Sequence, residues 1–142
     1  MWGILIAVLS GALMSVQGVF NTEVTKQTSL WVSSAFVQFS ALLVCLAVWF
    51  FRDRTSFATL AAVEHKYMLV SGVLGALITV TVIKSMENLG PARAAMLIVI
   101  AQLLIAYLIE LCGIFGIEKQ PLEMRKVIGM IIAVAGIVIF KW

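Results

Sequence analysis

Residues 92–112 read ARAAMLIVIAQLLIAYLIELC, and this stretch decides what kind of fold the chain has. Within it only Arg93 and Glu110 carry a charge. An α-helix rises about 1.5 Å per residue, so roughly 20 apolar residues cross the ~30 Å hydrocarbon layer of a bilayer. The stretch therefore predicts a helix that spans a membrane.

The composition extends this prediction to the whole chain. Of its 142 residues, 63% are hydrophobic and 12% are charged, whereas soluble domains carry about 25% charged residues. This composition argues against both a soluble domain and a disordered chain. The net charge of +3 comes without a basic run, so we expect no nucleic-acid partner. With one histidine and two cysteines, we predict no metal site, no disulfide framework and no cofactor.

Five apolar stretches of this kind are separated by polar and charged residues. We predict an all-α integral membrane bundle, with helices favoured over strands because lipid offers no partner to unpaired backbone groups. Gly90 and Pro91 predict a tight turn between the third and fourth stretches. The amphipathic stretch 55–65 is too short to cross and is expected at the membrane surface. The predicted domain is a single transmembrane domain, residues 1–142, with spans at about 2–23, 31–51, 67–86, 91–112 and 124–141.

The basic residues give only a weak orientation signal. With five spans, six Lys or Arg residues fall on the side of the N-terminus and four on the other side, which leans towards a cytoplasmic N-terminus. A chain with so small a bias is able to insert both ways. Two oppositely inserted copies would form a ten-helix unit with inverted repeats, the architecture used for alternating access. We therefore predict an antiparallel homodimer of dual topology, with a paralogous partner chain as the alternative.

Polar side chains inside the first two spans are the next candidates. Gln17 and Asn21 are four residues apart and share a face with Ser10, and Ser34 and Gln38 repeat the spacing in the second span. Such groups either join helices by hydrogen bonds, each contributing about 0.6 to 2 kcal/mol, or line a wet cavity. We expect the two serines to join helices, and for the three amides both interpretations stay open.

The fourth span carries the strongest candidates. Gln102 lies near its middle, and Tyr107 and Glu110 follow. Eight residues separate Gln102 from Glu110, which places them within roughly 80° of each other around a helix. Glu110 is either a solvated charge at the headgroup level or a cavity acid that binds a cation or proton. The candidate cavity or coupling residues are thus Gln17, Asn21, Gln38, Gln102, Tyr107 and Glu110.

Several motifs together resemble a known family. Residues 17–21 (QGVFN) resemble a Gln-Gly-x-x-Asn motif, and residues 71–76 (SGVLGA) resemble a Gly-Gly-x-x-Gly-Ala motif. Residues 101–104 (AQLL) resemble Gly-Gln-x-x, and residues 109–116 (IELCGIFG) resemble Ile-Asp-x-x-Gly-x-Phe-Gly. All four motifs, in this order and spacing, are those of the YdcZ-like family in the drug/metabolite transporter superfamily. Ser71 and Ala101 replace family glycines, Glu110 replaces an aspartate, and Leu111 replaces a frequent histidine. The changed acid and the missing histidine put any acid–histidine proton handling in doubt.

The resemblance implies a multi-pass protein of the bacterial inner membrane, equivalent to half of a ten-span transporter. It implies export or exchange of small metabolites, with cationic or amphipathic molecules as the expected substrate class. It places Gln17, Asn21, Gln102 and Glu110 at signature positions. The predicted function is a secondary transporter with alternating access at the antiparallel interface. The alternative is a non-transporting membrane assembly or partner subunit, and no enzymatic activity is expected because no nucleophile–base pair or phosphate-binding loop is present.

Overall fold

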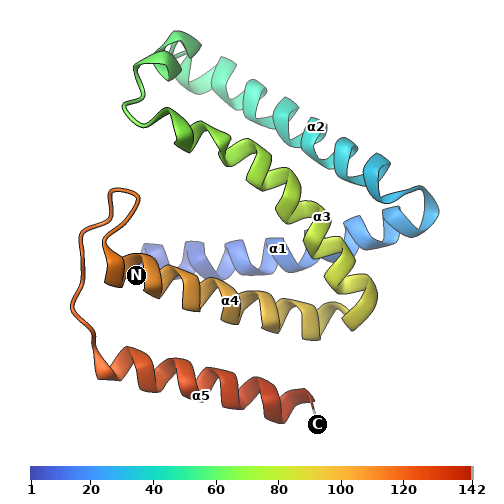
Figure 1. Ribbon diagram of the computed structural model, residues 1–142. Helices are drawn as coiled ribbons and strands as arrows, with labels where there is room; N and C mark the ends of the chain where they lie inside the picture. The colour runs from blue at the N-terminus through green and yellow to red at the C-terminus, as the bar shows by residue number, and fades with distance from the viewer. Residues whose placement is uncertain (142) are drawn as a thin grey trace. The chain divides into compact units, whose positions relative to one another are not determined.

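The computed structural model describes residues 1–141, and it confirms the predicted all-α fold. The chain is 85% helical, and residues 1–141 contain no strand. Three short helical segments lie between the second and third α-helices: the π-helical turn η1 (Trp49–Asp53) and the 3₁₀ segments η2 (Phe57–Ala62) and η3 (Lys66–Val70). The α-helices are α1 (Trp2–Gln27), α2 (Leu30–Val48), α3 (Ser71–Leu89), α4 (Pro91–Cys112) and α5 (Met124–Lys141) (Figure 1).

Within residues 1–141, four helical stretches are long and apolar enough to cross a membrane. They are Trp2–Gln27, Leu30–Asp53, Lys66–Leu89 and Pro91–Cys112. The fifth predicted span corresponds to α5, which has 18 residues and carries three basic residues near its ends. At about 1.5 Å per residue α5 is close to 27 Å long, and basic ends are able to reach the headgroups. Its crossing of the membrane remains a prediction.

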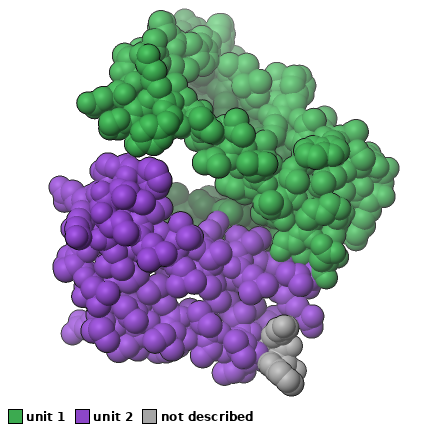
Figure 2. All heavy atoms as spheres, in the orientation of Figure 1, with its two compact units in different colours: residues 1–88 green, residues 89–142 purple. Residues whose placement is uncertain are grey.

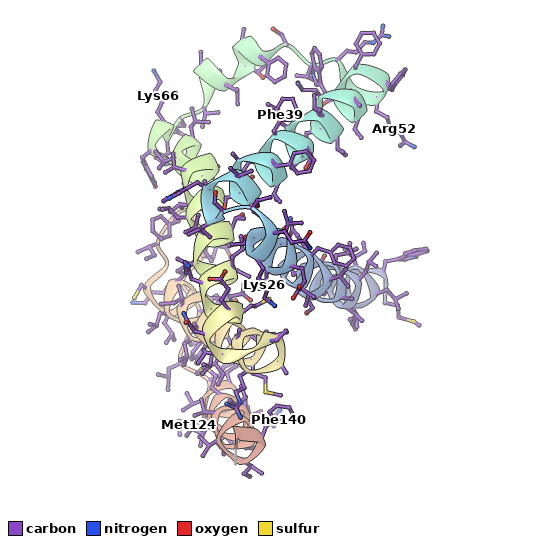
Figure 3. The ribbon with its side chains drawn as sticks, turned by 90° about the vertical axis from the view of Figure 1, so that its right-hand side faces the viewer. Lys26, Phe39, Arg52, Lys66, Met124 and Phe140 are labelled. Carbon is purple, nitrogen blue, oxygen red and sulfur yellow. The ribbon has the colours of Figure 1, made fainter. Side chains whose placement is uncertain are left out.

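The chain divides into two compact units, Met1–Asn88 and Leu89–Trp142, coloured separately in Figure 2. In the first unit, α1 meets α2 at a corner where Ser29 caps α2 by accepting a hydrogen bond from the Val32 amide (3.2 Å). Figure 3 labels Lys26 just before this corner and Arg52 in the turn that follows α2. The small buried core of this unit joins α1 to α3, because Gly18 packs against Met86.

The second unit is a hairpin of α4 and α5, which lie side by side and run in opposite directions (Figure 1). Local signals set its bounds. Pro91 is the first residue of α4, after Gly90 with φ +81°, and Gly113 caps the other end in the left-handed conformation (φ +66°). Beyond the cap, the Gln120 amide donates to the Glu110 carbonyl (2.9 Å). The hairpin therefore places the end of α4 next to the start of α5.

Helix α1 continues four residues beyond the predicted end of the first span, to Gln27. Threonine hydroxyls in this polar stretch are satisfied by carbonyl groups one turn earlier. The Thr22 hydroxyl donates to the Gly18 carbonyl and the Thr28 hydroxyl to the Val24 carbonyl, each at 2.8 Å. The polar run Asn21-Thr22-Glu23 therefore lies within the helix and does not end it.

Candidate functional site

Gln17 and Asn21 lie on one face of α1, as their spacing predicts. Both line a groove of about 530 Å³ between α1 and α2, whose walls are otherwise mostly apolar, and both line a smaller hollow of about 60 Å³ between α1 and α3. Asn21 is 8% exposed, whereas Gln17 is exposed. Among the side chains of residues 1–140, none forms a hydrogen bond with the Gln17 amide. Gln17 therefore offers hydrogen-bonding groups at the mouth of both hollows.

A seam of buried hydroxyl groups continues from Asn21 towards the α1–α2 corner. The Ser33 hydroxyl donates to the Asn21 carbonyl (3.1 Å) and joins α2 to α1. Nearby, the hydroxyl oxygens of Thr25 and Ser34 are buried without a hydrogen-bond partner in the described chain. We expected Ser34 to join helices, and its hydroxyl makes no such bond here. The sequence signal for the seam was the concentration of Thr and Ser between positions 22 and 34.

Gln38 joins two helices. Its amide nitrogen donates to the Thr79 hydroxyl (3.2 Å), and that hydroxyl donates to the Gly75 carbonyl one turn earlier in α3 (3.0 Å). Gly75 lies close to this bond, because a Cβ there would be in ordinary contact, at 4.0 Å, with the Gln38 nitrogen. Of the two interpretations left open for Gln38, its geometry favours the hydrogen-bonded link between α2 and α3.

Gln102 lies on an open part of α4. It lines a shallow hollow of about 450 Å³, and within residues 1–141 no side chain forms a hydrogen bond with it. Glu110 lines a different hollow, and Ala106 borders both. Eight residues of helix therefore bring Gln102 and Glu110 to neighbouring hollows, not to one common hollow.

Glu110 lies between α4 and α5, where it pairs with a residue of the next helix. Its Oε2 is 3.3 Å from the Lys126 Nζ, and the same Nζ is 3.5 Å from the Glu123 Oε1. The Lys126 Nζ also lies 5.6 Å from the centre of the Tyr107 ring, within the range of a cation–π interaction. Because side chains of this cluster remain about half exposed, their charges keep contact with water or headgroups.

Tyr107 is the buried support of this cluster. It is 7% exposed, and its hydroxyl accepts a hydrogen bond from the Glu123 amide (3.0 Å) and donates to the Glu123 carbonyl (3.5 Å). These two bonds hold the ring between the helices of the hairpin. The hollow beside it measures about 350 Å³ and is lined by Leu103, Ala106, Tyr107, Glu110, Lys126, Gly129 and Met130.

Lys126 and Glu123 were not predicted as site residues. A signal for Lys126 existed in the sequence. Glu110 comes two residues before the end of α4, and Lys126 comes two residues after the start of α5. In an antiparallel helix hairpin, residues equally far from the loop lie at the same level, so the acid and the base are expected to meet.

The comparison with family models identifies the family. Residues 2–139 match the family described as "Putative inner membrane exporter, YdcZ". The chain belongs to the YdcZ family. It is accordingly a multi-pass inner membrane protein, and the description of its family points to a transporter. No curated protein and no solved structure matches the chain.

The YdcZ family match covers all six predicted site residues. The structure places three of them in each compact unit: Gln17, Asn21 and Gln38 in the first, and Gln102, Tyr107 and Glu110 in the second. Tyr107 and Glu110 share one hollow. Within residues 1–141, no group of three or more His, Cys, Asp or Glu side chains is arranged to hold a metal ion.

Proposed function

We propose that this protein exports small amphipathic organic cations by alternating access, and that its working unit is an antiparallel homodimer. The inner membrane exporter family supports the transport function. The observation that carries the choice of substrate is the position of Glu110. This carboxylate lines a hollow of about 350 Å³ whose other walls include Leu103, Ala106 and Met130. An acid beside apolar walls suits a molecule with a positive head and a short apolar tail.

A role of Glu110 in cation binding follows from its setting. Its side chain is 42% exposed, so an incoming cation is able to reach it. Its partner in the absence of cargo is the Lys126 ammonium group at 3.3 Å. The carboxylate is therefore already placed to accept a positive charge, which is what a cation carrier needs at its binding site.

The dimer is proposed because one copy leaves polar groups without partners. The amides of Gln17 and Gln102 are exposed, and an amide in hydrocarbon without a hydrogen bond is costly. Enclosing each of them in an interface between two copies would give it polar neighbours. Gly136 of α5 has nothing outside its own helix backbone within 4 Å of the space that a Cβ would fill, so α5 is open to close helix packing there. The small orientation bias of the basic residues fits two opposite insertions.

Uptake into liposomes tests the proposal. The purified full chain is reconstituted, and saturable uptake of radiolabelled hexyltrimethylammonium, a permanent cation, is measured for the wild type and for Glu110→Gln. We expect Glu110→Gln to lower saturable uptake at least about tenfold, because an uncharged amide binds a cation weakly. The matched control is Glu118→Gln, which removes a carboxylate from the exposed loop and is expected to leave uptake unchanged.

The possible outcomes separate the candidate functions. Wild-type uptake by Glu110→Gln would contradict the role of this carboxylate. Absence of saturable uptake by the wild type, for hexyltrimethylammonium and for a panel of other organic cations, would contradict cation export. It would favour the non-transporting partner subunit instead.

A further inference from the structure

The Lys126 ammonium group occupies a position whose surroundings would bind any small organic cation. It lies 3.3 Å from a Glu110 oxygen and 3.5 Å from a Glu123 oxygen, with the Tyr107 ring centre 5.6 Å away. Two carboxylates and an aromatic face are the groups by which proteins recognise organic ammonium ions. The cation in this position belongs to the protein itself.

The charges of the cluster do not balance. Glu110 and Glu123 supply two negative charges, and Lys126 supplies one positive charge. Among residues 1–140, whose side chains the structure describes, no other Lys or Arg forms an ion pair with either carboxylate. The cluster therefore keeps one negative charge, which attracts further cations to this position. The hollow beside it, with apolar walls at Leu103 and Met130, has room for such a molecule.

We propose that this position is the subsite for the positive head of the cargo, and that Lys126 occupies it when no cargo is bound. Lys126 is then a specificity-determining residue, a tethered competitor that lowers the affinity for organic cations. The inference rests on the proposed function, because it names the contacts that one hollow of the exporter makes with its substrate. The expected ligand is a small ammonium compound with a short apolar chain.

A bound cation is able to displace the Lys126 ammonium group from between the carboxylates, because its ion pairs are weak and its side chain is able to adopt another position. Its side chain is 40% exposed, and ion pairs between such partly exposed groups contribute little to stability. Lys126 is the third residue of α5. A long side chain near a helix end is able to turn its ammonium group towards the headgroups while its apolar stem stays on the helix.

The part of the subsite that remains is held in place independently of Lys126. The Tyr107 hydroxyl bonds to both the amide and the carbonyl of Glu123 (3.0 and 3.5 Å). The Glu110 carbonyl accepts from the Gln120 amide (2.9 Å). These bonds fix the ring and the backbone that carries both acids, so removal of the lysine leaves the two carboxylates and the ring available to another cation.

Equilibrium binding tests the inference without relying on transport. Hexyltrimethylammonium chloride is titrated by calorimetry into the purified full chain in detergent at low salt, and hexanoate serves as the anionic control. For Lys126→Met, which removes the charge and keeps an unbranched side chain, we expect about fivefold tighter binding of the cation. That factor corresponds to the loss of a competing ion pair of about 1 kcal/mol. For Lys126→Arg, which keeps the positive charge, we expect an affinity close to that of the wild type.

Arg125→Met is the matched control, because it removes the neighbouring positive charge, which forms none of the ion pairs found among residues 1–141. We expect it to leave the affinity unchanged. If Lys126→Met does not fold, as judged by helical circular dichroism and gel filtration, Lys126→Gln replaces it. Equal or weaker binding by the charge-removing variant, or no binding by any variant, would overturn the inference. If Lys126→Met binds hexyltrimethylammonium more tightly but the wild type takes up no organic cation, the subsite is supported and the export function is refuted.

Discussion

Met86 of α3 fills the space that the missing side chain of Gly18 leaves on α1. A Cβ at Gly18 would lie 2.5 Å from the Met86 Cε and 2.7 Å from its Sδ. Met86 is 5% exposed and Gly18 is buried, so this contact belongs to the small core of the first unit. Close approach through a glycine is a common way for membrane helices to associate, because lipid provides no hydrophobic driving force between them.

We predict that Gly18→Ala destabilises the protein by about 1 kcal/mol, the low end of the cost of overpacking, because the atoms it displaces are the end of a flexible methionine side chain. The measurement is the thermal unfolding midpoint in detergent. Gly11→Ala on the same helix is the control, because nothing lies within 4 Å of its Cβ position. It is expected to be neutral or slightly stabilising, since alanine favours helices. In a Met86→Ala background, Gly18→Ala should cost nothing further, and an equal loss in both backgrounds would contradict the packing account.

The hydrogen bond between Gln38 and Thr79 is expected to stabilise the pairing of α2 with α3. In a double-mutant cycle of Gln38→Leu and Thr79→Val, we predict a coupling energy of about 0.6 kcal/mol, the average for such bonds in membranes. Thr81→Val is the matched control, because the Thr81 hydroxyl donates only within α3, to the Leu77 and Ile78 carbonyls. Combined with Gln38→Leu, it should show no coupling. Strictly additive effects at Gln38 and Thr79 would mean that the bond does not contribute.

The sequence predicted helices far better than helix pairs. Helix α4 has the expected bounds because Pro91 and Gly113 are local signals that act without tertiary context. Helix α1 continues beyond the predicted first span, since hydropathy predicts the apolar segment and not where the helix ends. Which helices are neighbours cannot be obtained from periodicity alone. The Gln38–Thr79 bond and the Lys126–Glu110 pair needed three-dimensional geometry, although the hairpin symmetry around residues 113–123 already indicated the second.

The glycine cap of α4 is predicted to be sensitive to substitution for two reasons. Gly113 has φ +66°, and a Cβ there would lie 2.9 Å from the Lys119 Cβ. Gly116 also has a positive φ (+82°) but has nothing within 4 Å of its Cβ position. We expect Gly116→Ala to cost about 1 to 2 kcal/mol from the backbone conformation alone, and Gly113→Ala to cost about 1 kcal/mol more from crowding. The thermal unfolding midpoints of the two variants measure these costs. Equal midpoints would show that crowding against Lys119 does not contribute.

The claim that two oppositely inserted copies form the exporter is tested most directly by labelling from one side of the membrane. Cys45 and Cys112 are replaced by alanine, Glu118→Cys is introduced in the loop between α4 and α5, and intact cells are treated with a membrane-impermeant maleimide. The account predicts that about half of the chains are labelled in intact cells and all of them after permeabilisation. Labelling of all chains, or of none, before permeabilisation would show one fixed orientation and contradict the antiparallel homodimer.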